Sequence, residues 1–167
     1  MPKLLILVLA ACIIYAQQNS KESTRILEKK TGKYTKHGWN HYGPGYFTLD
    51  SETGVLKSHG GMGLLWYSKK KYKNFILELD YKTSEPKANS GIFLRVPDIP
   101  ASDDYIYHSF EIQINNAGRG KHKTAAVYDG QSDSKYASIP ACEWNHYKIT
   151  FQDSRIQVEL NGEQVND

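Results

Sequence analysis

One short segment carries polar side chains that could exchange protons and bind hydroxyl groups. Residues 110–115 are Phe-Glu-Ile-Gln-Ile-Asn, so apolar and polar residues alternate. Because residues two apart share one face of a β-strand, Glu111, Gln113 and Asn115 lie on the same face. A carboxylate transfers protons and amides form directed hydrogen bonds, which together suit a sugar ligand. The solvated face of an antiparallel sheet alternates in the same way, so a plain surface also explains this pattern.

A second segment adds a cation to this chemistry. Residues 91–96 are Gly-Ile-Phe-Leu-Arg-Val, so Ile92 and Leu94 are expected in the core, with Phe93 and Arg95 on the opposite face. A guanidinium group can hold an oxyanion or a carboxylate through two hydrogen bonds. An exposed ion pair at the surface is the alternative role for Arg95.

The histidines do not form a recognisable metal site. They are scattered, and only His37 and His41 have the spacing of a helical pair, in a glycine-containing stretch where a helix is not expected. No cofactor and no zinc cage are therefore predicted. A calcium-like cation held by Glu111, Asn115 or Asn116 together with water is the alternative.

Two other catalytic motifs lack support. The glycine-rich residues 60–63 are followed by the strand-like residues 64–66 and not by a helix, which predicts a turn and not a phosphate loop. The sequence has no Gly-x-Ser-x-Gly motif, and Cys142 stands in Pro-Ala-Cys-Glu-Trp, outside any known nucleophile motif. Nucleophilic catalysis by Ser or Cys is therefore not expected.

Short alternating segments predict the strands that must position these side chains. They are rich in β-branched and aromatic residues and cover residues 46–49, 64–67, 74–82, 91–96, 105–115, 147–151 and 155–160. Gly, Pro, Asn and Asp separate them at the spacing of an antiparallel sandwich. The chain of 167 residues suits one domain. We therefore expect an all-β, two-sheet fold.

The charge balance argues against nucleic acid as a partner. The formal net charge is +3, and no stripe of basic residues alternates with aromatic ones. No feature of the sequence specifies an oligomeric state.

The first 16 residues predict a secretory leader. Lys3 precedes an apolar run that ends at Ala16 and is too short to span a membrane. Alternatively, residues 9–12, Leu-Ala-Ala-Cys, resemble a lipobox, in which residues 1–11 are removed and a lipid on Cys12 tethers the protein to a membrane. A buried N-terminal helix is a third interpretation. We expect an extracytoplasmic location, whether periplasmic, secreted or lipid-anchored, and a polar linker or short helix over residues 17–38.

Several segments together resemble one known family, the 3-keto-disaccharide hydrolase domain. The matching segments are Gly-Gly-Met-Gly-Leu-Leu-Trp at 60–66, Asn-Ser-Gly-Ile-Phe-Leu-Arg at 89–95, Ser-Phe-Glu-Ile-Gln-Ile at 109–114, Thr-Ala-Ala-Val-Tyr-Asp at 124–129, Glu-Trp-Asn at 143–145 and Leu-Asn-Gly at 160–162. They occur in the family's order and cover residues 39–167. The resemblance implies a concanavalin A-like jelly roll, two stacked antiparallel sheets with a sugar site on the concave one.

The resemblance also implies a reaction on glycosides that carry a ketone at the third sugar carbon. In that reaction Glu111 is the expected base and Arg95 the expected support for the enolate oxygen. The substrate-binding candidates are Gln113, Asn89, Tyr128 and Asp129, Trp66 as a stacking surface, and also Asn116 and His108. Asn116 departs from the family's usual Asp and Ala125 from its usual Gly, which counts against a metal or a second acid at that position.

Two other functions stay open. The same fold hosts non-catalytic carbohydrate-binding modules, which hold sugar without turning it over. A structural or adhesion domain, the third alternative, has no affinity for sugar at all.

The end of the chain predicts further strands beyond it. Residues 160–167 have the pattern of a strand end, an Asn-Gly turn and the start of a return strand. In the family more strands follow this turn, and without them a sheet edge would stay unpaired. We therefore expect a sequence truncated at its C-terminus.

We predict that the mature protein lacks residues 1–16, or residues 1–11 if Cys12 carries a lipid. Export machinery removes such a leader during translocation. Intact-mass spectrometry of the protein isolated from its native cells tests this, and a mass that still includes Met1 contradicts it.

Overall fold

Antiparallel strands build both layers of the fold. The structure is a computed structural model that describes residues 7–16, 23–97, 99–132, 135 and 140–167. The large sheet contains, in spatial order, β14 (Glu163–Asn166), β13 (Arg155–Leu160), β12 (Asn145–Gln152), β9 (Phe75–Thr83), β1 (Leu7–Ala16), β7 (Leu56–His59) and β6 (Tyr46–Leu49), with β2 (Ser23–Arg25) paired to β1.

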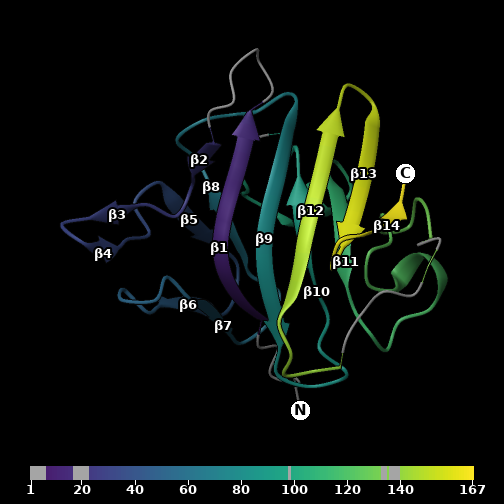
Figure 1. Ribbon diagram of the computed structural model, residues 1–167, viewed down its shortest axis with the longest axis horizontal. Helices are drawn as coiled ribbons and strands as arrows, with labels where there is room; N and C mark the ends of the chain where they lie inside the picture. Colours follow the sequence, from purple (N-terminus) through teal and green to yellow (C-terminus); the bar gives the residue numbers. More distant parts are fainter. Residues whose placement is uncertain (1–6, 17–22, 98, 133–134, 136–139) are drawn as a thin grey trace.

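The second layer consists of shorter sheets behind the large one. In Figure 1, β1, β9, β12 and β13 stand side by side in front of β8, β10 and β11. This layer pairs β10 (Ser90–Leu94) with β11 (Phe110–Ile114), and β5 (Trp39–Tyr42) with β8 (Leu64–Tyr67). A small hairpin, β3 (Lys29–Lys30) and β4 (Lys33–Tyr34), and two 3₁₀ turns, η1 (Asp103–Ile106) and η2 (Gly120–His122), complete the described elements. The predicted all-β sandwich is confirmed.

Strand alternation decides which side chains fill the space between the layers. Along β9, buried and half-buried residues alternate without a break. Its inner residues, such as Leu77 and Leu79, join Ile149 from β12 and Ile112 and Ile114 from β11 in one core cluster. Each fully buried apolar side chain of this size stabilises the fold by about 1.5–3 kcal/mol. Phe110, predicted to be buried with them, is 43% exposed at the end of its strand.

β11 is held on three sides. It pairs with β10 on one edge, and on the other edge the Gln113 N–H donates to the Ala126 carbonyl at 3.0 Å and the Tyr128 N–H to the Glu111 carbonyl at 2.8 Å. From the large sheet, the Tyr147 hydroxyl donates to the Gln113 carbonyl at 2.8 Å. The position of β11 is therefore fixed by backbone contacts that do not involve its groove-facing side chains.

The predicted leader segment forms a central strand in this structure. β1 pairs with β9 from Leu7 to Ala16, with one irregularity after Ala10, and with β7 at Val8 and Leu9. Lys3 lies outside the described residues. Cleavage of the leader stays a prediction, as does the lipid on Cys12. Within the described residues, no helix is long and apolar enough to span a membrane.

The segment predicted as a polar linker or helix differs from that expectation. Its first part, residues 17–22, lies outside the described residues. From residue 23 onward it contains the short strands β2, β3 and β4. Ile26 and Leu27 are buried, and the Trp39 indole N–H donates to the Ile26 carbonyl at 2.8 Å. The two apolar residues that suggested a narrow helix face therefore anchor the segment to the fold.

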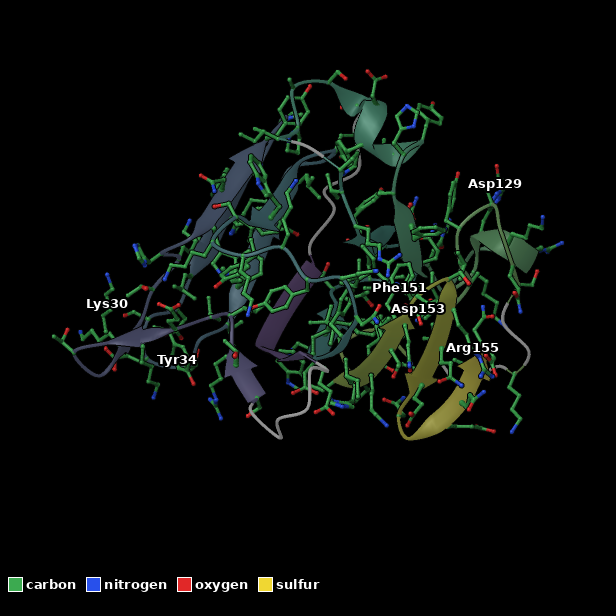
Figure 2. The ribbon with its side chains drawn as sticks, turned by 90° about the horizontal axis from the view of Figure 1, so that it is seen from above. Lys30, Tyr34, Asp129, Phe151, Asp153 and Arg155 are labelled. Carbon is green, nitrogen blue, oxygen red and sulfur yellow. The ribbon has the colours of Figure 1, made fainter. Side chains whose placement is uncertain are left out.

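Arg95 connects the two layers and does not join the face that carries Glu111. β10 ends at Leu94, and Arg95 has a left-handed backbone with φ of 55°. Its guanidinium donates to the carbonyls of Asp153 at 2.8 Å and Lys73 at 2.6 Å, and lies 3.6 Å from the ring centre of Phe151. Phe151 and Asp153 lie close together in Figure 2. Because alternation holds only while the backbone stays extended, the predicted shared face of Arg95 and Glu111 is wrong.

We predict that Arg95→Lys lowers the free energy of unfolding by about 1–3 kcal/mol, because lysine cannot bond both carbonyls while it stacks on Phe151. Urea unfolding monitored by fluorescence measures the change. The control is Arg155→Lys, at an exposed ion pair with Asp167, for which a change within about 0.5 kcal/mol is expected. Equal effects of the two substitutions would count against the structural role of Arg95.

Candidate active site

Glu111 lies on the side of β11 that faces away from the large sheet. It stands directly opposite Phe93 in the β10–β11 register, and Gln113 stands opposite Gly91. The Glu111 side chain crosses to the neighbouring strand and lies over Gly91, where a Cβ atom would overlap its Oε1. The carboxyl group can lie there only because position 91 has no side chain.

Three aromatic rings form a cluster that begins at Phe93, the residue opposite Glu111. The Phe93 and Tyr105 rings meet edge to face with centres 5.1 Å apart, and Tyr105 meets Tyr42 of β5 in the same way at 6.4 Å. Tyr105 comes from η1 and is only 8% exposed. The three rings connect β5, η1 and β10 into one apolar wall beside Glu111.

Burial in this setting changes the acidity of Glu111. It raises the pKa of the carboxyl group from its ordinary value to about 7, because the charged form loses water. The guanidinium of Arg95 is engaged elsewhere and does not counteract this effect. Near neutral pH the group thus occurs in both protonation states, as a proton-transferring residue requires.

A cavity of about 1030 Å³ opens over Glu111. Leu77 and Leu79 of the large sheet also contribute to its lining, so it continues between the two layers. Its walls combine apolar and polar groups, which is typical of sites for small organic ligands. Several predicted site residues line it: Trp66, Asn89, Arg95, Glu111, Gln113 and Tyr128.

Three of these residues present side chains suited to a sugar. Trp66 is half-buried on β8, and Asn89 is exposed just before β10. Tyr128 is 40% exposed, and its ring stacks on His122 with centres 4.8 Å apart and planes 26° apart. The hydrogen bond from the Tyr128 N–H to the Glu111 carbonyl fixes its position relative to the carboxyl group.

The other predicted binding residues are placed less favourably. Gln113 is 1% exposed, and its Oε1 accepts a hydrogen bond from the Ile114 N–H. Asn116 accepts from the Thr124 hydroxyl at 2.7 Å through its Oδ1. Neither side-chain oxygen is therefore free of an intramolecular bond.

Like Asn116, the predicted residues Asp129 and His108 do not line the cavity. Asp129 is exposed at the edge of the molecule in Figure 2, with its carboxylate 3.7 Å from His122. His108 is exposed after η1 and does not line the cavity. Among the residues that the structure describes, no group of three or more His, Cys, Asp or Glu side chains could hold a metal ion.

Sequence reasoning missed the aromatic wall. Strand parity placed Phe93 on the face opposite the core, but no sequence pattern assigned it a role in the site. Tyr105 could not, because residues 105–115 were expected to be one strand, whereas Tyr105 lies in η1 and reaches the site from a turn.

Several solved structures are similar to this chain, among them two from one bacterium, and no curated protein matches it. Both are crystal structures of a putative glycosyl hydrolase from Parabacteroides distasonis ATCC 8503. The first is 26% identical, with a TM-score of 0.56, over 80% of this chain and 61% of that one. The second is 22% identical, with a TM-score of 0.62, over 77% and 65%, and supports the fold alone. The chain thus spans less than two thirds of the length of either structure.

A family model gives the more specific result. The model of the 3-keto-alpha-glucoside-1,2-lyase-like domain matches residues 27–167, which confirms the resemblance found in the sequence segments. The match includes Glu111, every predicted site residue that lines the cavity and the strands β3 to β14. This chain belongs to the 3-keto-alpha-glucoside-1,2-lyase-like domain family.

Proposed function

We propose that this domain cleaves glycosides that carry a ketone at C3, with Glu111 as the base that removes the proton from C2. The observation that carries the proposal is the position of Glu111, which is half-buried at the wall of a large cavity and whose pKa burial raises to about 7. The family and the glycosyl hydrolase name of the similar structures support a carbohydrate substrate.

The chemistry needs little more than a well-placed base. The C3 ketone acidifies the hydrogen on C2, and Glu111 accepts that proton. The electrons of the C–H bond move into an enolate, and their return forms a C1–C2 double bond while the C1–O bond breaks. The leaving alkoxide takes up a proton, for which the protonated Glu111 is the nearest acid. Addition of water to the new double bond then gives the overall result of hydrolysis.

The remaining groups of the cavity bind the sugar in this proposal. Trp66 and Tyr128 offer ring faces to the C–H surfaces of a sugar, and Asn89 offers an amide to its hydroxyls. Because Arg95 bonds the carbonyls of Asp153 and Lys73, we assign it no part in stabilising the enolate. The Asn89 amide and the Tyr128 hydroxyl are the proposed hydrogen-bond donors to that oxygen.

A non-catalytic sugar-binding module is the second candidate, because the same exposed rings suit binding without reaction. Purified protein incubated with 3-keto-glucosides and with unmodified disaccharides, with binding measured by calorimetry, separates the two functions. Product formation from the keto sugar supports catalysis. Binding without product supports the module, and the absence of both contradicts a sugar function. An exported, extracytoplasmic protein remains part of our proposal.

We predict that Glu111→Gln lowers turnover of a 3-keto-glucoside by about 10²- to 10⁴-fold, because an amide cannot accept the C2 proton. Substrate binding should stay within a few-fold, since Gln has nearly the shape of Glu. The assay compares kcat with Kd for both proteins. Glu143→Gln, at an exposed residue that does not line the cavity, serves as the control and should retain activity. Full turnover by the Glu111→Gln protein would remove Glu111 from the mechanism.

We also predict that Glu111→Gln stabilises the fold at pH 8 but not at pH 4. The folded pKa lies above the unfolded one, so ionisation of Glu111 opposes folding as the pH rises from about 4.5 towards 7, and the full cost is present above pH 7. Gln avoids this cost, which we expect to be about 1–2 kcal/mol. Urea unfolding at both pH values measures the difference, with Glu143→Gln as the control. A difference that does not change with pH would show that Glu111 is not buried as described.

A further inference from the structure

The 3₁₀ turn η1 is built so that it holds one ring in a fixed place. The Ser102 side chain accepts a hydrogen bond from the Asp104 N–H at 3.2 Å and donates to the Asp104 carboxylate at 2.7 Å. At the other end of the turn, the Ser109 hydroxyl donates to the Tyr105 carbonyl at 2.5 Å. These bonds anchor the backbone of Tyr105 from both sides.

The two tyrosines of this region have opposite environments. Tyr105 is 8% exposed and packs edge to face on both Phe93 and Tyr42, whereas Tyr107 is 81% exposed. Phe93 in turn stands directly opposite Glu111 across the β10–β11 pair. The ring of Tyr105 therefore contacts the side chain that stands opposite Glu111, and all three residues line the same cavity.

We propose that Tyr105 is a positioning residue for Glu111, and that its ring, acting through Phe93, keeps water away from the carboxyl group. The carboxyl group lies over the backbone at Gly91 and borders the cavity, so the aromatic rings limit how much of its remaining surface water can reach. The role of Tyr105 in catalysis rests on the proposed function of Glu111, but its effect on the carboxyl group does not.

The charged and titratable groups near this site do not account for the raised pKa of Glu111. They are Asp103 and Tyr105 of η1, Tyr42 of β5 and Tyr128 beside β11, and the cavity is also lined by Lys70, Lys71, Arg95, Tyr67 and Tyr72. Strand β10 contributes no titratable side chain. Burial is the one cause that raises the pKa of Glu111. Burial raises the pKa of Tyr105, and negative charge on Asp103 and Glu111 adds to this effect, which fits the closeness of Tyr105 to Glu111.

The test follows the protonation of Glu111 by NMR, from the chemical shift of its ¹³C-labelled side-chain carboxyl carbon as the pH is changed. In Tyr105→Ala, water reaches the carboxyl group and its pKa should fall by about one unit or more. In Tyr105→Phe, which keeps the ring, it should hardly move. Tyr107→Ala removes the same number of atoms from an exposed position and should leave the titration unchanged. An unchanged Glu111 titration in folded Tyr105→Ala overturns the proposal.

Two additions keep the test decisive. If Tyr105→Ala does not fold, Tyr105→Leu, which keeps an apolar but smaller side chain, should still lower the pKa, and no change there also overturns the proposal. The acid limb of the kcat/KM profile should move to lower pH together with the NMR titration, because the base must be ionised. A shifted NMR titration with an unshifted kinetic profile would leave the positioning role intact and refute Glu111 as the base.

Discussion

The contact between β11 and the large sheet is the constraint on which the rest of the site depends. Ile112 and Ile114 are buried in the core shared with β9 and β12. The Tyr147 hydroxyl of β12 donates a hydrogen bond to the Gln113 carbonyl of β11. Because Ile112 and Ile114 place one face of β11 in the core, alternation places the Glu111 side chain on the opposite face. The raised pKa of Glu111 is thus a consequence of how the two layers pack.

The sequence allowed the layers to be predicted but not the ends of the elements. The alternating segments of β9, β10, β12 and β13 were found within one or two residues, because burial on one face imposes a period of two. Arg95 was misplaced because β10 ends at Leu94, two residues before the predicted end, and the left-handed backbone at Arg95 breaks the alternation of side chains. Tyr105 was missed because no periodic signal marks a single 3₁₀ turn whose role depends on contacts distant in sequence.

The apolar composition of residues 7–16 is compatible with two roles, a secretory leader and a strand of the large sheet. An apolar run of this length behind a lysine is typical of a secretory leader, and an apolar run is equally what a strand between two neighbours in a sandwich needs. Figure 1 shows β1 beside β9 in the middle of the large sheet. Composition cannot separate the two roles, since both depend on removal of apolar side chains from water.

The glycine beneath the carboxyl group has an evolutionary consequence. The Glu111 side chain fills the space that a side chain at position 91 would need. A methyl group at position 91 therefore requires a shorter or differently oriented acid at position 111. Substitutions at the two positions should consequently be accepted together and not singly. Among relatives, a residue larger than glycine at the position of Gly91 would then mark members that have lost the long acid and, with it, the proposed proton transfer.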